Sequence, residues 1–91
     1  MSQITIIHNP SEATLKAQNV YDWPIWQKEV SEFPWSYDME EVCYVLAGEV
    51  IVTPEYCEPV KIQAGDMVTF PKGMNFHWLI KQDIKKHYQF L

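Results

Sequence analysis

Glu41 and Cys43 are the two side chains of this sequence best placed for acid–base or nucleophilic chemistry. They stand two positions apart in Glu-Val-Cys-Tyr-Val-Leu-Ala (41–47), whose alternation predicts a strand, so both would lie on one face. A carboxylate set among aromatic side chains is poorly hydrated. Glu41 is therefore a candidate general acid or base, or an anchor for an amine-bearing ligand. Alternatively, it only satisfies the core by accepting a hydrogen bond from a Tyr or Trp.

The thiol of Cys43 and the hydroxyl of Tyr37 extend this set. A cation such as Lys86 or His87 beside the thiol would lower its pKa and make it a nucleophile, whereas a buried Cys in a strand otherwise acts as a small apolar residue. Tyr37 would either donate a proton to a ligand or pack with its hydroxyl in water. Both alternatives stay open, and Glu41, Tyr37 and Cys43 are the candidate catalytic residues.

The C-terminal segment 84–90 adds charged groups to one face of a further predicted strand. Its alternation turns either Lys86 and Tyr88 or Lys85 and His87 inward, and the sequence does not settle the phase. The first phase is preferred because it buries more apolar surface.

Brief apolar runs, broken by Pro, Gly and Asp about every eight to twelve residues, predict the strands that must position these side chains. A short helix is predicted at residues 11–18, where Asn9-Pro10-Ser11-Glu12 offers turn and N-cap chemistry. Turns are expected at segments such as Ala47-Gly48-Glu49 and Pro71-Lys72-Gly73. The predicted strands are 4–8, 41–47, 49–53, 59–63, 67–70, 76–81 and 84–90.

Length and composition fit one all-β domain spanning residues 1–91. The chain has 47% hydrophobic residues and four Trp, which supply the dense apolar packing that so short a domain needs. Its formal net charge is -5 and it contains no Arg, which argues against nucleic-acid binding. Trp23 and Trp26, on either side of Pro24, are interpreted as core or dimer-interface packing.

Two cysteines are too few for a disulfide framework or a zinc ribbon. The N-terminal segment has neither the basic residues nor the apolar length of a signal peptide, and no run is long enough to span a membrane. These features predict a protein of the cytoplasm, or of an organelle lumen if a transit peptide has been removed, without a membrane partner.

Two spaced motifs resemble those of the cupins. Glu41 is followed by six residues and Gly48, as at the end of the first cupin motif, and sixteen residues separate Gly48 from Gly65. The segment from Gly65 to Gly73 then matches Gly-x5-Pro-x-Gly, the start of the second motif. The resemblance implies a small cupin barrel, a jelly roll or double-stranded β-helix, with one short N-terminal helix.

The likeness is greatest to small single-domain cupins related to the cupin domain of (S)-ureidoglycine aminohydrolase and, more distantly, to ethanolamine-utilisation cupins. It covers most of residues 20–90. The segments that carry it are Trp23-Pro24-Ile25-Trp26, Trp35-Ser36-Tyr37, Glu41-Val42-Cys43-Tyr44 and Lys85-Lys86-His87-Tyr88.

The resemblance also shows what is missing for a metal site. The positions that hold three histidines in metal-binding cupins are Trp35, Tyr37 and Phe76 here. One carboxylate cannot hold a transition metal tightly, so no cofactor is expected. A weak divalent site would need Glu41 and His77, with a bulge turning His77 inward; strict alternation places it outside.

The predicted ligand pocket is thus an aromatic cavity with one carboxylate. Beside the candidate catalytic residues, it is lined by Trp35, Phe76, Trp78, Lys86 and Tyr88. Three functions remain open: an enzyme acting on a small polar, possibly nitrogen-containing metabolite; a non-catalytic binding module; or a structural dimer with a filled barrel. Strand 4–8 is a candidate for strand exchange in the expected homodimer.

Overall fold

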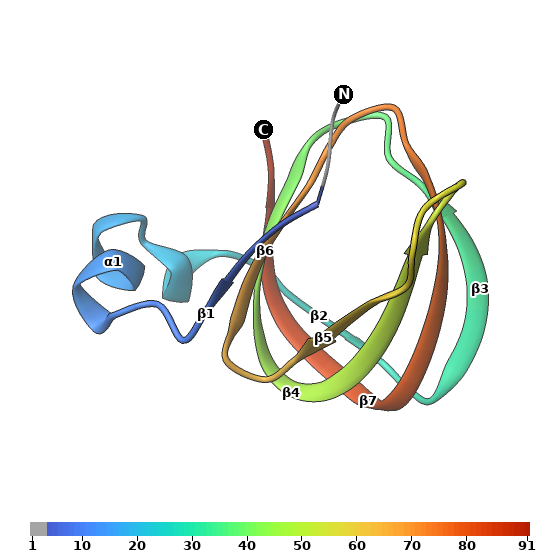
Figure 1. Cartoon of the computed structure of the whole chain (residues 1–91). Helices are drawn as coiled ribbons and strands as arrows, with labels where there is room; N and C mark the ends of the chain where they lie inside the picture. The colour runs from blue at the N-terminus through green and yellow to red at the C-terminus, as the bar shows by residue number, and fades with distance from the viewer. Residues whose placement is uncertain (1–3) are drawn as a thin grey trace.

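Two long strands, β4 (Glu41–Pro54) and β7 (Asn75–Phe90), run antiparallel to each other along the barrel (Figure 1). The computed structural model describes residues 4–91, and the other strands pair with these two or with β6. One continuous path runs in the order β1-β6-β4-β7-β2, while β5 pairs with β4 and β3 pairs with β7. The remaining strands are β1 (Thr5–His8), β2 (Ile25–Lys28), β3 (Ser31–Ser36), β5 (Val60–Gln63) and β6 (Asp66–Phe70). The predicted all-β barrel with one short α-helix is confirmed.

The expected turn at residues 47–49 and the expected break at 82–83 are both wrong, because β4 and β7 continue through them. Their register shifts between Val45 and Val50 instead, as in a β-bulge. Gly48, at φ +99°, lies in this irregular stretch close to the backbone of Asp83. A bulge bends a strand sharply, so both strands can serve two walls of the barrel.

Strands β2 and β3 were not among the predicted strands. Pro24 and Pro34, together with charged residues between the aromatic ones, obscure the alternation there. Both pair with β7: Trp26 lies opposite Lys86, and Trp35 lies opposite Phe76.

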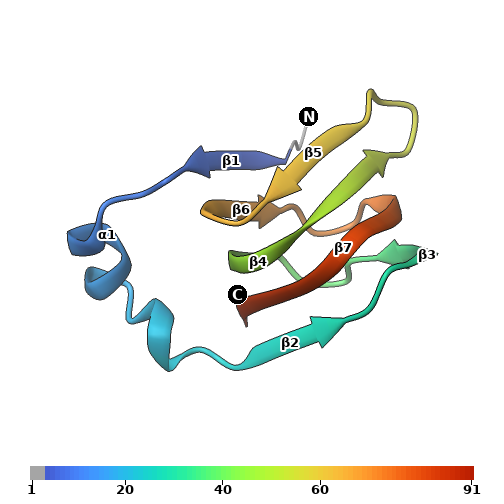
Figure 2. The ribbon, with the colours of Figure 1, turned by 90° about the horizontal axis from the view of Figure 1, so that it is seen from below.

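Helix α1 (Glu12–Ala17) lies outside the barrel, as Figures 1 and 2 show. The Ser11 hydroxyl caps it by accepting from the Thr14 N–H at 3.2 Å, as the sequence indicates. A 3-10 turn (Val20–Asp22), which was not predicted, follows. Both segments pack on the outer face of the sheet through Leu15, Val20, Met67, Trp23, Val42 and Tyr44.

A polar contact fixes this outer layer to β7. The side chain of His87 is buried beneath it, and its Nδ1 lies 2.9 Å from the carbonyl oxygen of Trp23. Next to it, Tyr21 meets the imidazole edge-on. The preferred phase of the C-terminal segment is therefore right, since Ile84 and Lys86 face the interior. His87 points to the outer face of the sheet, and the outer layer buries it there.

Strand β1 pairs only with β6 among the described strands, and it ends one path of the sheet. His8 Nδ1 lies 2.7 Å from Oδ1 of the buried Asp66, and this contact fixes the C-terminal end of β1 to β6. The exchange of this strand between two copies stays a prediction. No helix within residues 4–91 has the length and apolar character needed to cross a membrane.

The close approach at Gly48 gives a stability test. A Cβ at Gly48 would stand 2.4 Å from the Asp83 carbonyl oxygen and 2.8 Å from Ile84 Cα, so Gly48→Ala combines backbone strain with a clash. We expect it to lower the free energy of unfolding in urea by about 3 kcal/mol. Gly73→Ala is the control, because Gly73 also has a positive φ but nothing within 4 Å of the added Cβ; about 1 kcal/mol is expected there. Equal losses would contradict the steric argument.

Candidate functional site

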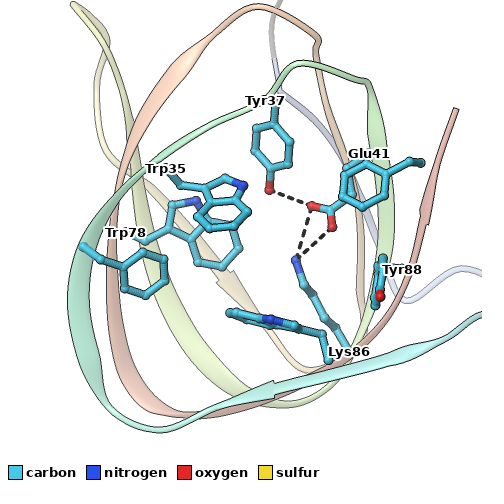
Figure 3. Close-up of a pocket in the computed structure, with 9 residues that line it drawn as sticks. Trp35, Tyr37, Glu41, Trp78, Lys86 and Tyr88 are labelled. Atoms are coloured by element: carbon cyan, nitrogen blue, oxygen red, sulfur yellow. Dashed lines mark hydrogen bonds and ion pairs between the residues drawn. The ribbon is translucent and has the colours of Figure 1, made fainter.

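A cavity of about 210 Å³ opens at one end of the barrel, where β2, β3, β4 and β7 come together. Figure 3 shows Tyr37, Glu41 and Lys86 converging on it, with Trp35 and Trp78 on one side and Tyr88 on the other. Most of its wall is aromatic. The lining residues are Trp26, Phe33, Trp35, Tyr37, Glu41, Trp78, Lys86, Tyr88 and Phe90.

An ion pair forms the polar part of this pocket. The Lys86 ammonium lies 3.3 Å from Glu41 Oε1 and 3.5 Å from Oε2. Both side chains are almost completely buried, with exposed fractions of 4% for Lys86 and 6% for Glu41. Glu41 is the first residue of β4. Lys86 lies on β7, opposite Val45 of β4, so two adjacent strands supply the two charges.

Aromatic rings also lie close to the ammonium. Lys86 Nζ lies 4.8 Å from the ring centroid of Trp78 and 5.0 Å from that of Trp26. Phe70, below, is at 5.8 Å. The negative face of each ring attracts the cation, and such contacts strengthen when water is excluded. Glu41 and the rings together compensate the charge of a lysine that would otherwise be costly to bury.

Tyr37 donates a hydrogen bond of 2.6 Å from its hydroxyl to Glu41 Oε1. Its backbone is held by the 71–74 loop, because its N–H donates to Met74 and its carbonyl accepts from Gly73. Its ring stacks on Phe70 at 5.0 Å. Burial, followed by the nearby charge of Glu41, raises the pKa of Tyr37 far above its ordinary value. The hydroxyl therefore keeps its proton and acts as a donor.

The indole of Trp78 completes the deep wall. It stacks against Phe33 with ring centroids 5.9 Å apart, and it meets Trp26 edge-on. Its Nε1–H is buried and has no hydrogen-bond partner within residues 4–91. A buried donor without an acceptor costs about 1–3 kcal/mol, so this N–H lowers the stability of the fold.

Two of the sequence-predicted site residues lie behind the pocket. Cys43 is buried in the core, and burial raises the pKa of its thiol to about 11 although Lys86 acts in the opposite direction. Its burial and raised pKa favour the small apolar residue over the nucleophile. Phe76 packs edge-on against Tyr37 and Phe70 and fills the core below, where it does not line the cavity.

The residues present do not fit a metal centre. His77 is half exposed on the outer side of β7, where its imidazole contacts Glu32 and not Glu41. Trp35, which was predicted to line the pocket, does so from its mouth, where it is 45% exposed. Across residues 4–91, no cluster of three or more His, Cys, Asp or Glu side chains is suited to hold a metal ion.

Sequence reasoning missed part of the aromatic wall. Trp26 was interpreted as core or interface packing, yet its ring lies over the Lys86 ammonium. Phe33 was not singled out. The signal was weak, because both residues sit on short strands interrupted by charged residues, and their position depends on pairing with β7. Tyr88 and Lys86, in contrast, line the pocket as the preferred strand phase predicts.

Similar solved structures place this geometry among the cupins. A DUF861 family protein from Thermotoga maritima is 45% identical in sequence, with a TM-score of 0.94, and the match covers 98% of this chain and 100% of that one. A Salmonella typhimurium protein assigned to ethanolamine utilisation (protein Q, EutQ) is 27% identical, with a TM-score of 0.65, over 72% of this chain and 53% of its own.

The EutQ protein of Clostridium difficile, at 19% identity and a TM-score of 0.63, shares the fold over 70% of this chain and 50% of its own. The chain thus spans about half the length of these two EutQ proteins. No curated protein matches the sequence. Residues 15–88 match the family profile of EutQ-like cupin domains. On this match and the 45% identity to the DUF861 protein, the chain belongs to the EutQ-like cupin domain family.

Proposed function

We propose that this cupin binds a small polar metabolite in the aromatic pocket, with Glu41 as its polar centre. The observation that carries the proposal is the buried Glu41–Lys86 pair, which borders a cavity and not a filled core. Tyr37 fixes the carboxylate from one side through its hydrogen bond. The expected relationship to the (S)-ureidoglycine aminohydrolase cupin stays a prediction, and it contributes no substrate here.

The energetics favour function over structure as the reason for the pair. Burying two charges costs more in lost hydration than their attraction usually returns, and apolar residues of similar volume often replace such pairs without loss of stability. The deeper barrel is already filled by apolar side chains such as Phe70, Val45 and Val52. A polar group at the mouth is therefore better explained by a ligand than by folding.

Acid–base chemistry on the bound molecule is the second candidate. The Tyr37 hydroxyl donates to the same Glu41 oxygen that contacts Lys86, so three groups that can hold protons are linked. Within this set Glu41 would take or give the proton, while Tyr37 and Lys86 would orient the carboxylate and the substrate. The expected homodimer stays a prediction; in this proposal it would shield the mouth of the pocket.

A double-mutant cycle tests the energetic argument. Glu41→Gln leaves the Lys86 ammonium buried without its counter-ion, and Lys86→Met leaves the carboxylate unpaired, so each should lower the free energy of unfolding by about 3–5 kcal/mol. The double variant removes both charges and keeps an acceptor for Tyr37. We expect it to recover most of that loss in urea unfolding. A double variant that stays as unstable as either single would show that the pair stabilises the fold, whereas losses that add would show that the two charges do not interact.

Ligand binding is best followed at the four indole N–H groups by NMR. In a screen of small polar compounds, a bound compound should shift the resonances of Trp26, Trp35 and Trp78, which line the pocket. Trp23 packs in the outer layer and is the internal control. Conversion of a bound compound by the wild-type protein but not by Glu41→Gln would support chemistry. Shifts confined to Trp23 would rule out the pocket as the binding site.

The thiols give a separate check on the candidate nucleophile. With a pKa of about 11, Cys43 carries about one thiolate in a thousand molecules at pH 8, and it is also buried. Cys57 is exposed. Iodoacetamide at pH 8 should therefore label the native chain once, at Cys57, and twice in urea, as read by intact and peptide mass. Labelling of native Cys43 at the rate of Cys57 would restore it as a nucleophile.

A further inference from the structure

We infer that the ligand of this pocket is a small, uncharged, planar molecule that presents a carbonyl oxygen and an N–H side by side, as an amide or lactam does. The inference rests on the proposed function and specifies its ligand. It follows from the charge, the unused hydrogen bonds and the walls of the cavity.

Charge neutrality comes first. Among the lining residues, Lys86 supplies one positive charge and Glu41 one negative charge, while Tyr37 keeps its proton. The other walls are aromatic rings. A carboxylate ligand would place a second negative charge beside Glu41, and an ammonium ligand a second positive charge beside Lys86. Uncompensated charge is expensive in a water-poor site, so a neutral ligand is favoured.

The hydrogen bonds left open define the polar edge of the ligand. The Lys86 ammonium has three N–H groups, and within residues 4–91 only Glu41 accepts from it, at 3.3 and 3.5 Å. Among the same residues, Glu41 Oε2 accepts only the longer of these contacts, whereas Oε1 also receives the Tyr37 hydroxyl. A free donor and a free acceptor thus stand together. A carbonyl oxygen toward Lys86 and an N–H toward Glu41 would use both.

The aromatic walls and the volume of the cavity favour a ligand that is flat and small. Rings of Trp26, Phe33 and Trp78 present faces and edges to the space around Lys86, and flat π systems stack on such surfaces. At about 210 Å³, the cavity is smaller than the roughly 300–1,000 Å³ of pockets for drug-sized molecules, so the ligand is small.

Three probes with one ring and different charges test this inference: benzamide, benzoate and benzylamine. Binding is measured at pH 7 by calorimetry, with indole N–H shifts to locate it. We expect benzamide to bind at least about tenfold more tightly than either charged probe, a difference that corresponds to about 1.4 kcal/mol. Its binding should shift the N–H resonance of Trp78.

Charge variants make the test sharper. Glu41→Gln gives the pocket a net positive charge and should raise benzoate affinity relative to benzamide by about tenfold; Lys86→Met should do the same for benzylamine. The double variant, which keeps the pocket neutral, guards against unfolding of the singles and should lose benzamide affinity about tenfold. Glu49→Gln is the matched control, because Glu49 pairs with Lys61 away from the pocket and should change nothing.

The outcomes separate the two proposals. If benzoate or benzylamine binds most tightly to the wild-type pocket, the neutral-ligand inference is overturned while the proposed binding function stands. If benzamide is preferred but its affinity is unaltered in the double variant, the ion pair does not recognise it and the inference also falls. If no probe shifts Trp26, Trp35 or Trp78, the inference about the ligand is overturned, and the proposed binding function is then decided by the wider screen of polar compounds.

Discussion

The antiparallel pairing of β4 with β7 is the interaction on which both the barrel and its pocket depend. It runs from Glu41 opposite Phe90 to Pro54 opposite Phe76, so one ladder spans almost the full length of both strands. Because side chains alternate across a strand, this register alone turns Glu41, Cys43 and Val45 to the same interior as Lys86 and Tyr88. The bulge around Gly48 then bends the ladder, which lets two strands wall a closed interior.

The position of the Lys86 ammonium beside Glu41 can be compared with the metal sites of other cupins. In metal-binding cupins, the acidic residue of the first motif stands with histidines around a cation. Here the corresponding Glu41 faces a cation that belongs to the chain, the Lys86 ammonium, which also contacts the rings of Trp26 and Trp78. A side chain of the protein itself thus compensates the charge of this carboxylate.

The sequence was sufficient for the fold because motif glycines and strand alternation are local signals. Gly48 and Gly65 both adopt positive φ, as their motif positions suggest, and the phase that buries Ile84 follows from apolar area alone. The number of strands was harder to predict from the sequence. A Gly between two apolar runs predicts a turn, and only the pairing partner reveals that it is a bulge inside one strand.

The site was predictable to the extent that its residues share a strand. Glu41, Lys86, Trp78 and Tyr88 follow from alternation, and all four line the cavity. How deep a residue lies does not follow: Phe76 and Cys43 share the inward face but sit below the cavity floor. Trp26 comes from an irregular segment, and its approach to Lys86 depends on a long-range pairing that the local pattern does not encode.

The contact between His87 and the carbonyl oxygen of Trp23 links the outer layer to the choice of cation inside the barrel. Lys86 and His87 are neighbours on β7 and point to opposite faces, so a slip of that strand by one residue would exchange an ammonium for an imidazole in the pocket. The polypeptide outside the barrel therefore works as a register lock.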